Sequence, residues 1–95
     1  MKYIIRRYPV LDKIPSGQEM SRTDLKDWSA VKSAIDYTER NENSLARLKM
    51  IRMVHWDRTH TLEGAALSIP CSRSLAAKWQ REFFEEVARN RGLLD

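Results

Sequence analysis

The sequence contains a single cysteine, Cys71, among its 95 residues. An internal disulfide is therefore excluded, which agrees with a reducing compartment and removes the class of small scaffolds stapled by disulfides. The sequence also has no apolar run near the roughly 20 residues needed to cross a bilayer, and its first residues lack the long hydrophobic stretch of a signal peptide. We therefore expect a cytoplasmic protein with no membrane partner.

Motifs of enzymes are also missing. The sequence has no glycine-rich phosphate loop, nucleophile elbow or paired-carboxylate motif. Its two histidines, His55 and His60, are five residues apart, which places them on different faces of a helix, and no cluster of Cys or His accompanies them. Cys71 has no catalytic base partner in the sequence. We therefore expect no enzymatic activity, no metal site and no cofactor.

A basic excess is present, and it is small, with a formal net charge of +4. A charge of this size favours an anionic partner only weakly, so its distribution is more informative. Residues 44–60 hold four Lys/Arg and one Asp/Glu and form the most basic segment. In the segment that follows, basic residues come first and acidic residues after them: Arg73, Lys78 and Arg81, then Glu82, Glu85 and Glu86. A helix with one basic end suits docking by that end.

The length fits one compact domain, because a much larger core needs more sequence to enclose it. Apolar residues make up 42% of the chain, which is ordinary for a globular protein. The pattern predicts an all-α domain of about four helices over residues 1–95. Residues 1–22 are expected to form an arm or short strand, because Pro9, Pro15 and Gly17 interrupt any helix there. Two supporting helices are expected within 23–60, followed by a third region over 61–91.

The two supporting helices are predicted from apolar residues at helical spacing. The first is expected to follow N-cap chemistry at Ser21 and Thr23 and to end near Arg40, and the second to begin at Asn43 or Ser44 and to end near Asp57 or Arg58. The predicted buried stripe of the first consists of Leu25, Trp28, Val31 and Ile35. That of the second consists of Leu45, Leu48, Ile51 and either Val54 or His55. We expect the tryptophans, Trp28, Trp56 and Trp79, to pack in the core rather than to stack on bases.

Residues 61–91 are predicted to form a short helix, a sharp turn and a long helix. Leu62, Ala65 and Ala66 share one face of the short helix, and the small alanines allow a second helix to cross closely. Pro70 prevents a continuous helix, and Ser72 can cap the long helix that follows. Leu75, Ala76, Trp79, Phe83 and Val87 are expected to be buried, and Gly92 to end the helix. The outward face of the long helix then carries Arg73, Ser74, Ala77, Lys78 and Arg81.

Residues 45–85 resemble the helix-turn-helix of sigma-factor region 4 and the similar module in small phage transcription regulators of the RinA and ArpU type. The resemblance rests on the order of features in IRMVHWDRTHTLEGAALSIPCSRSLAAKW. A helix that ends in an aromatic residue is followed by a short polar link and a Leu-Glu-x-x-Ala helix. After these come a turn and a Ser that precedes a second helix. One departure is Pro70, which stands near the place where many such modules have Gly.

The resemblance implies a DNA-binding protein that places the start of its last helix in the major groove. Arg73 would pair with guanine, Ser74 and Lys78 would contact neighbouring bases, and Ala77 would touch a thymine methyl. Thr61 and Ser72 would hold phosphates, and Arg81 and Arg58 would add charge beside the backbone. The implied function is a sequence-specific transcription regulator, encoded by a phage or prophage. Its partners would be double-stranded DNA and RNA polymerase. Because a single reading helix gives limited specificity, a second copy of the chain is a further candidate partner, and we would seek its contact at Phe84, Val87 and Leu93.

Three other interpretations fit the same residues. The last helix can be an ordinary amphipathic surface helix with basic residues outside. The chain can also be a helical protein-interaction module, a partner of RNA polymerase or of a phage assembly, in which the basic helix faces an acidic protein surface. A DNA-packaging component would use the same helix-turn-helix without regulating transcription. Phe84, at the border of the buried stripe, either covers the core or meets a partner.

Overall fold

The computed structural model describes residues 2–14, 20–69 and 71–93, which form five α-helices, one π-helical turn and the segments that connect them. The elements are α1 (Lys2–Asp12), α2 (Arg22–Glu39), α3 (Ser44–Ile51), η1 (Arg52–Trp56), α4 (Leu62–Ser68) and α5 (Arg73–Asn90). The described residues contain no strand, so the predicted all-α class is confirmed. The four helices predicted from residue 23 onward are all present, and their ends lie within a few residues of the expected positions.

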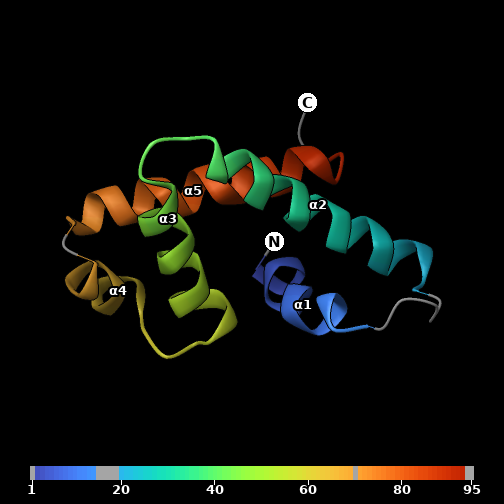
Figure 1. The fold of residues 1–95 in the computed structure, drawn as a ribbon, viewed down its shortest axis with the longest axis horizontal. Coiled ribbons are helices and arrows are strands. Elements are labelled where there is room, and N and C mark those ends of the chain that lie inside the picture. Colours follow the sequence, from blue (N-terminus) through green and yellow to red (C-terminus); the bar gives the residue numbers. More distant parts are fainter. Residues whose placement is uncertain (1, 15–19, 70, 94–95) are drawn as a thin grey trace.

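The two longest helices, α2 and α5, run antiparallel side by side along the length of the molecule (Figure 1). α3 packs against both of them. α4 lies beside the first turns of α5, while α1 packs against α2 and η1 (Figure 1). The start of α5 therefore lies at one end of the molecule, away from the start of α2. No helix of the described residues has the length and apolar character that crossing a membrane requires.

The first segment is a helix, and the prediction of an arm or strand is wrong for Lys2–Asp12. Pro9 lies inside α1 and cannot donate a hydrogen bond to the carbonyl of Ile5, one turn earlier. The indole N–H of Trp56 donates to that carbonyl instead, at 2.8 Å. Ile5 and Leu11 are buried, which fixes α1 on the core. Pro15 and Gly17 lie outside the described residues.

Four charged residues, the Asp27 cluster, join three helices at the far end of α5. The cluster consists of Arg7 on α1, Asp24 and Asp27 on α2, and Arg91 directly after α5. Asp27 is 4% exposed and accepts hydrogen bonds from Arg91 Nε at 2.7 Å and Arg7 Nη1 at 3.4 Å. Arg7 Nη2 also donates to Asp24 at 2.6 Å, and this bond lowers the pKa of the Asp24 carboxyl. The cluster thus connects the two ends of the described chain.

The buried face of α2 differs from the predicted stripe. Val31 is fully buried as expected, whereas Leu25 is 49% exposed, so that part of the prediction is wrong. Ala30 and Ala34 fill the core positions beside Val31, together with the polar residues Asp27 and Thr38. The Thr38 hydroxyl donates to the Ala34 carbonyl at 2.7 Å, which satisfies it inside the core. The buried face of α2 is therefore shifted around the helix by about one residue position from the predicted apolar stripe.

The second supporting helix confirms part of its predicted stripe. Ile51 and His55 are buried, whereas Leu45 is 86% exposed and was wrongly placed inside. Its cap position is Asn43, which has a left-handed φ of 61° and makes no side-chain capping bond. The chain widens to a π-helical turn at η1, where the Asp57 N–H donates to the Arg52 carbonyl at 2.7 Å. The extra residue in this turn changes which side chains face the core.

The buried face of α5 agrees with the sequence prediction. Ala76, Trp79, Phe83 and Val87 are all buried, and Leu75 is half-buried at the edge of the core. Gly92 has a φ of 79°, and the Leu93 N–H donates back to the Ala88 carbonyl at 2.8 Å. This pattern ends a helix at a left-handed residue, a conformation that glycine adopts without steric cost. The predicted stop of the last helix is therefore confirmed.

Candidate nucleic-acid interface

α4 and α5, which we call the α4–α5 pair, pack against each other. Ala65 is fully buried and Ala66 is 4% exposed, so these two small residues lie on the inner side of α4, as predicted. After Ser68 the backbone becomes extended at Ile69, with φ −100° and ψ 107°, and Ile69 itself is buried. Pro70, to which the sequence assigns the bend, lies outside the described residues. α4 ends at Ser68 and α5 begins at Arg73, so the expected break between the two helices is present.

Both helices of the pair begin with a side-chain cap. The Thr61 hydroxyl accepts from the Gly64 N–H at 3.1 Å at the start of α4, and the Ser72 hydroxyl accepts from the Leu75 N–H at 3.0 Å at the start of α5. Replacing such a cap with alanine typically costs about 0.5 to 2 kcal/mol. The predicted Ser72 cap is confirmed, and both hydroxyl residues are exposed at the surface.

One face of α5 carries most of the predicted contact residues. They are all exposed: Arg73, Ser74, Ala77, Lys78 and Arg81. At 100° per residue these positions span about 140° around the helix, opposite the buried face. The structure therefore brings these five residues together on the outer side of α5. Thr61 and Arg58 belong to other parts of the chain: Thr61 caps the start of α4, and Arg58 lies in the loop between η1 and α4.

The cations of this face make only weak ion pairs. Arg73 Nε lies 3.2 Å from Glu63 Oε1 of α4, with the two side chains 72% and 65% exposed. Exposed pairs of this kind are worth about 0 to 1 kcal/mol, so the guanidinium can leave Glu63 for a stronger partner. Lys78 Nζ lies 3.9 Å from Glu82, whose closer partner is Arg47 at 2.7 Å. Both predicted base-contacting cations are therefore accessible.

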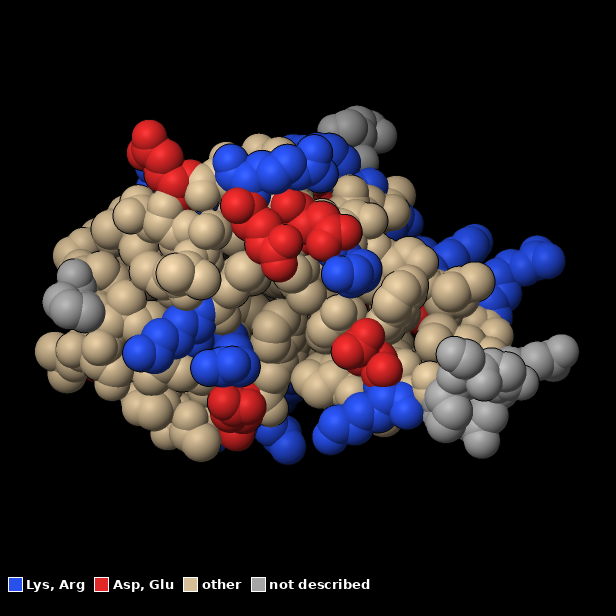
Figure 2. Space-filling model, viewed as in Figure 1, with Lys and Arg blue, Asp and Glu red and all other residues tan. Residues whose placement is uncertain are grey.

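The charge on the molecular face of Figure 2 is mixed. Lys and Arg side chains lie among Asp and Glu side chains, and the end near α4 is mainly uncharged in this view (Figure 2). Over the described residues on this face, no broad patch of one sign is present (Figure 2). On the face of the molecule seen in this view, therefore, Lys and Arg do not form one continuous basic field (Figure 2).

His55 joins η1 to the middle of α5. It is 2% exposed, its Nε2 lies 2.8 Å from the Gln80 side-chain oxygen, and its ring centroid lies 5.2 Å from that of Phe84. Burial lowers the pKa of His55, and the charges of Arg6 and Lys2 lower it further, while the Gln80 hydrogen bond opposes them. Phe84 is half-buried and covers the core through this contact.

The predicted dimer residues do not form one accessible patch. Val87 is fully buried, so it cannot contribute to contact with a second copy. Phe84 packs against His55 and the core, whereas Leu93 is 60% exposed. Of these three residues, only Leu93 presents most of its side chain to solvent. The homodimer stays a prediction without a defined surface.

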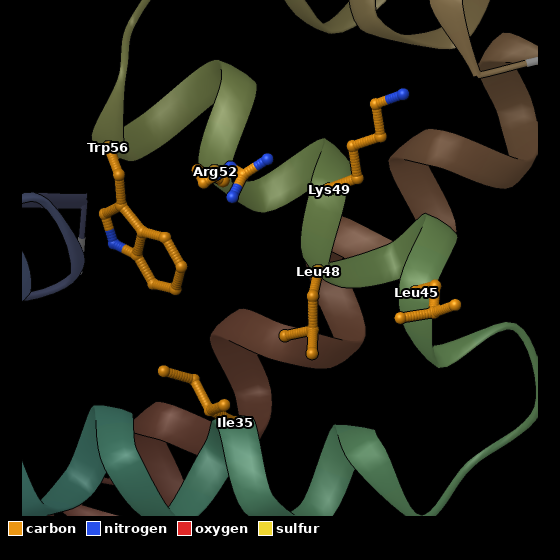
Figure 3. Close-up of a pocket in the computed structure, with 6 residues that line it drawn as sticks. All are labelled: Ile35, Leu45, Leu48, Lys49, Arg52 and Trp56. Carbon is orange, nitrogen blue, oxygen red and sulfur yellow. The ribbon is translucent and has the colours of Figure 1, made fainter.

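A second surface feature, which we call the α2–α3 groove, was missed because Leu45 was expected to face inward. The groove has a volume of about 350 Å³ and is lined by Ile35, Leu45, Leu48, Lys49, Arg52 and Trp56. Ile35, Leu48 and Trp56 point into the space between the helices, and Lys49 extends away from it (Figure 3). Arg47, on the opposite side of α3, binds Glu82 of α5. The groove and the α4–α5 pair are therefore separate surfaces.

No protein-family model, curated protein or solved structure matches this chain. Among the described side chains, no group of three or more potential metal ligands lies together.

Proposed function

We propose that the protein is a sequence-specific DNA-binding transcription regulator that places the first half of α5 in the major groove. The supporting observation is the exposed face of α5, where Arg73, Lys78 and Arg81 stand on a helix whose other side is held in the core. An α-helix with its side chains is about 10 to 12 Å across, and the major groove is about 12 Å wide. A capped helix at one end of the molecule can enter that groove.

The roles of the residues follow from their chemistry and their places on α5. Arg73, in the first turn, can pair bidentately with the O6 and N7 atoms of guanine. Ser74 and Lys78 can donate to neighbouring base edges, and Ala77 can contact a thymine methyl group. Arg81 lies further along the same side and supplies charge to a phosphate. Contacts to base edges select a sequence, whereas the phosphate contact of Arg81 positions the protein.

The two capping hydroxyls can bind phosphates without leaving their helices. Thr61 and Ser72 each accept a backbone N–H through the side-chain oxygen, so each retains its own hydroxyl hydrogen as a donor. The start of α5 also carries the positive end of the helix dipole, which attracts phosphate. This arrangement supports the proposed role of both residues at the edge of the groove.

Selection of a preferred duplex from a random pool, followed by affinity measurements, tests this function. We expect Arg73→Ala to weaken binding to the selected duplex about 5- to 150-fold more than to a random duplex, as loss of one bidentate contact of about 1 to 3 kcal/mol requires. Arg22→Ala, an exposed arginine at the start of α2, is the matched control and should change neither affinity. Failure of the wild-type protein to bind any duplex at low salt would overturn the proposal.

The α2–α3 groove supports a second candidate function, a protein-interaction module that binds an acidic helical partner. Leu45 is 86% exposed at its edge, and the cations Lys49 and Arg52 flank its apolar lining. An apolar side chain between acidic residues would complement this surface. Retention of a defined acidic partner, lost on Leu45→Gln, together with no affinity for duplex DNA, would favour this function.

Transcription assays with the selected duplex would separate a regulator from a DNA-packaging component.

A further inference from the structure

Glu82, in the middle of α5, lies between two cations that come from different helices. Its Oε2 atom accepts a hydrogen bond from Arg47 Nη1 of α3 at 2.7 Å, whereas its Oε1 atom lies 3.9 Å from Lys78 Nζ, one turn earlier on α5. A hydrogen bond between a charged donor and a carboxylate is about 2.7 to 2.9 Å long, so only the contact with Arg47 has that length. Glu82 is therefore bound to α3 rather than to the cation on its own helix.

Arg47 is held in place by a second contact with α5. Its guanidinium carbon lies 5.6 Å from the centroid of the Trp79 ring, within the range of a cation–π contact, and Trp79 is buried. The side chain of Arg47 is 20% exposed, whereas that of Lys78 is 58% exposed. Ion pairs that are partly buried are screened less by salt than exposed ones. The pair with Arg47 is therefore the stronger of the two contacts that Glu82 makes.

The bond from Arg47 determines how much negative charge Lys78 meets. With Arg47 in place, the charge of Glu82 is compensated by α3, and the Lys78 amine stays mostly in solvent. Without Arg47, the remaining described partner of Glu82 would be Lys78, at the i, i+4 spacing that allows a direct ion pair on a helix. Lys78 would then be occupied by a carboxylate of its own helix.

We propose that Arg47 is a positioning residue for DNA binding, which holds Glu82 and thereby leaves Lys78 available to base edges in the major groove. This inference rests on the proposed function and adds to it a residue of α3 that is not on the outer face of α5. Arg47 packs beside Trp79, on the side of α5 that the core covers, so it acts through Glu82 and not by a base contact of its own.

A loss of affinity and its rescue test this role on the selected duplex. We expect Arg47→Gln to weaken binding about 5-fold, the effect in water of one unit charge about 4 Å from the Lys78 amine. Adding Glu82→Gln to Arg47→Gln should restore the wild-type affinity, because it removes the charge that Arg47 held. In a Lys78→Ala background, Arg47→Gln should have no further effect. Arg47→Lys, which keeps a cation beside Glu82, should bind more tightly than Arg47→Gln.

Arg89→Gln is the charge-matched control. Arg89 binds Glu86 at 2.7 Å, so this variant also leaves one glutamate of α5 without its arginine. Arg89 is 11 residues after Lys78, which corresponds to about 16 Å along a helix. This separation exceeds the screening length of about 8 to 10 Å in physiological salt, so the affinity should be unchanged.

Four outcomes overturn the inference. Affinity that stays low when Glu82→Gln is added would show that Arg47 only supports the fold. An equal loss on Arg47→Gln with and without Lys78 would show a general charge effect. Glu82→Gln by itself, a variant that keeps Arg47, should not weaken binding, and a loss there would contradict the proposed competition for Lys78. A wild-type protein that binds no duplex contradicts the proposed function as well. Circular dichroism of each variant establishes that the helices are retained.

Discussion

At the C-terminal end of α5 arginine joins helices, whereas at the N-terminal end arginine lies in solvent. The side chain of Arg91 is 22% exposed and bonds to Asp27, a carboxylate that α2 supplies from the core. The side chain of Arg73 is 72% exposed, and its nearest carboxylate, Glu63, is itself at the surface. The residue type is the same at both ends, and the burial of the carboxylate differs. A buried acid makes one arginine structural, and its absence leaves the other available for a ligand.

The comparison separates the cations of the chain by their surroundings. Arg7 and Arg91 hold α1, α2 and α5 together through the Asp27 cluster. Arg73 and Arg81 lie on an outer helix face that the core does not use. We therefore expect substitutions of Arg7 and Arg91 to lower stability with little change in DNA affinity. Substitutions of Arg73 and Arg81 should lower DNA affinity with little change in stability.

The largest change in stability is expected for Asp27→Asn. It removes the charged acceptor that Arg7 and Arg91 share and should lower the free energy of unfolding by about 3 kcal/mol, since breaking a buried ion pair leaves unpaired charge behind. Urea unfolding measures this change. Asp57→Asn is the control, because the ion pair of Asp57 with Arg52 is 3.8 Å long and exposed. This variant should lower the free energy of unfolding by less than about 1 kcal/mol. A loss below 1 kcal/mol for Asp27→Asn would remove the distinction between the two ends.

Trp56→Phe tests how α1 is attached. The variant removes the N–H that donates to the Ile5 carbonyl, and the unpaired buried carbonyl should lower stability by about 1 to 3 kcal/mol. Trp28→Phe is the matched control, because its N–H bonds to the exposed Asp12 side chain, which water can satisfy. Equal losses in urea unfolding for the two variants would show that the Ile5 bond has no special role.

Ser72→Ala is expected to act on both stability and binding at the start of α5. Loss of the cap should lower the free energy of unfolding by about 1 kcal/mol and weaken binding to every duplex alike. Ser74→Ala, two residues later, should change stability by less than about 0.5 kcal/mol while affecting only the selected duplex. A reversal of these two patterns would contradict the assigned roles.

The smallest effect is expected from the protonation of His55, which lies between the two regions. Burial lowers its pKa in the folded state below the unfolded value of about 6.5, so the unfolded chain binds the proton first as the pH falls. The stability contributed by His55 is therefore present above pH 6.5 and decreases as the pH falls toward the folded pKa. His55→Gln should remove this dependence in unfolding curves between pH 7 and 5. If His60→Gln removed it instead, His55 would not be its source.

The sequence predicted the last helix well, because its apolar residues and its capping serine are local signals. Ala76, Trp79, Phe83 and Val87 follow helical spacing, and Ser72 caps the helix that begins after it. The outer face of α5 followed from the same periodicity. Elements that depend only on neighbouring residues were therefore predictable.

The remaining features depend on contacts that are distant in sequence. α1 was missed because Pro9 indicates an interrupted helix, and its missing hydrogen bond is replaced by Trp56, 51 residues from Ile5. Asp27 was missed as a core residue because a carboxylate does not count toward an apolar stripe, and its partners come from α1 and the end of α5. Leu45 followed the helical pattern but lies on a face of α3 that the other described helices leave 86% exposed at this residue. Pairing between distant residues determined each of these outcomes.

Amide chemical shifts recorded while a selected duplex is added test the division between the two ends most directly. We expect the largest perturbations at residues 72–81 of α5 and none around the Asp27 cluster. Perturbations confined to the α2–α3 groove, or none at residues 72–81, would contradict a reading role for the exposed face of α5.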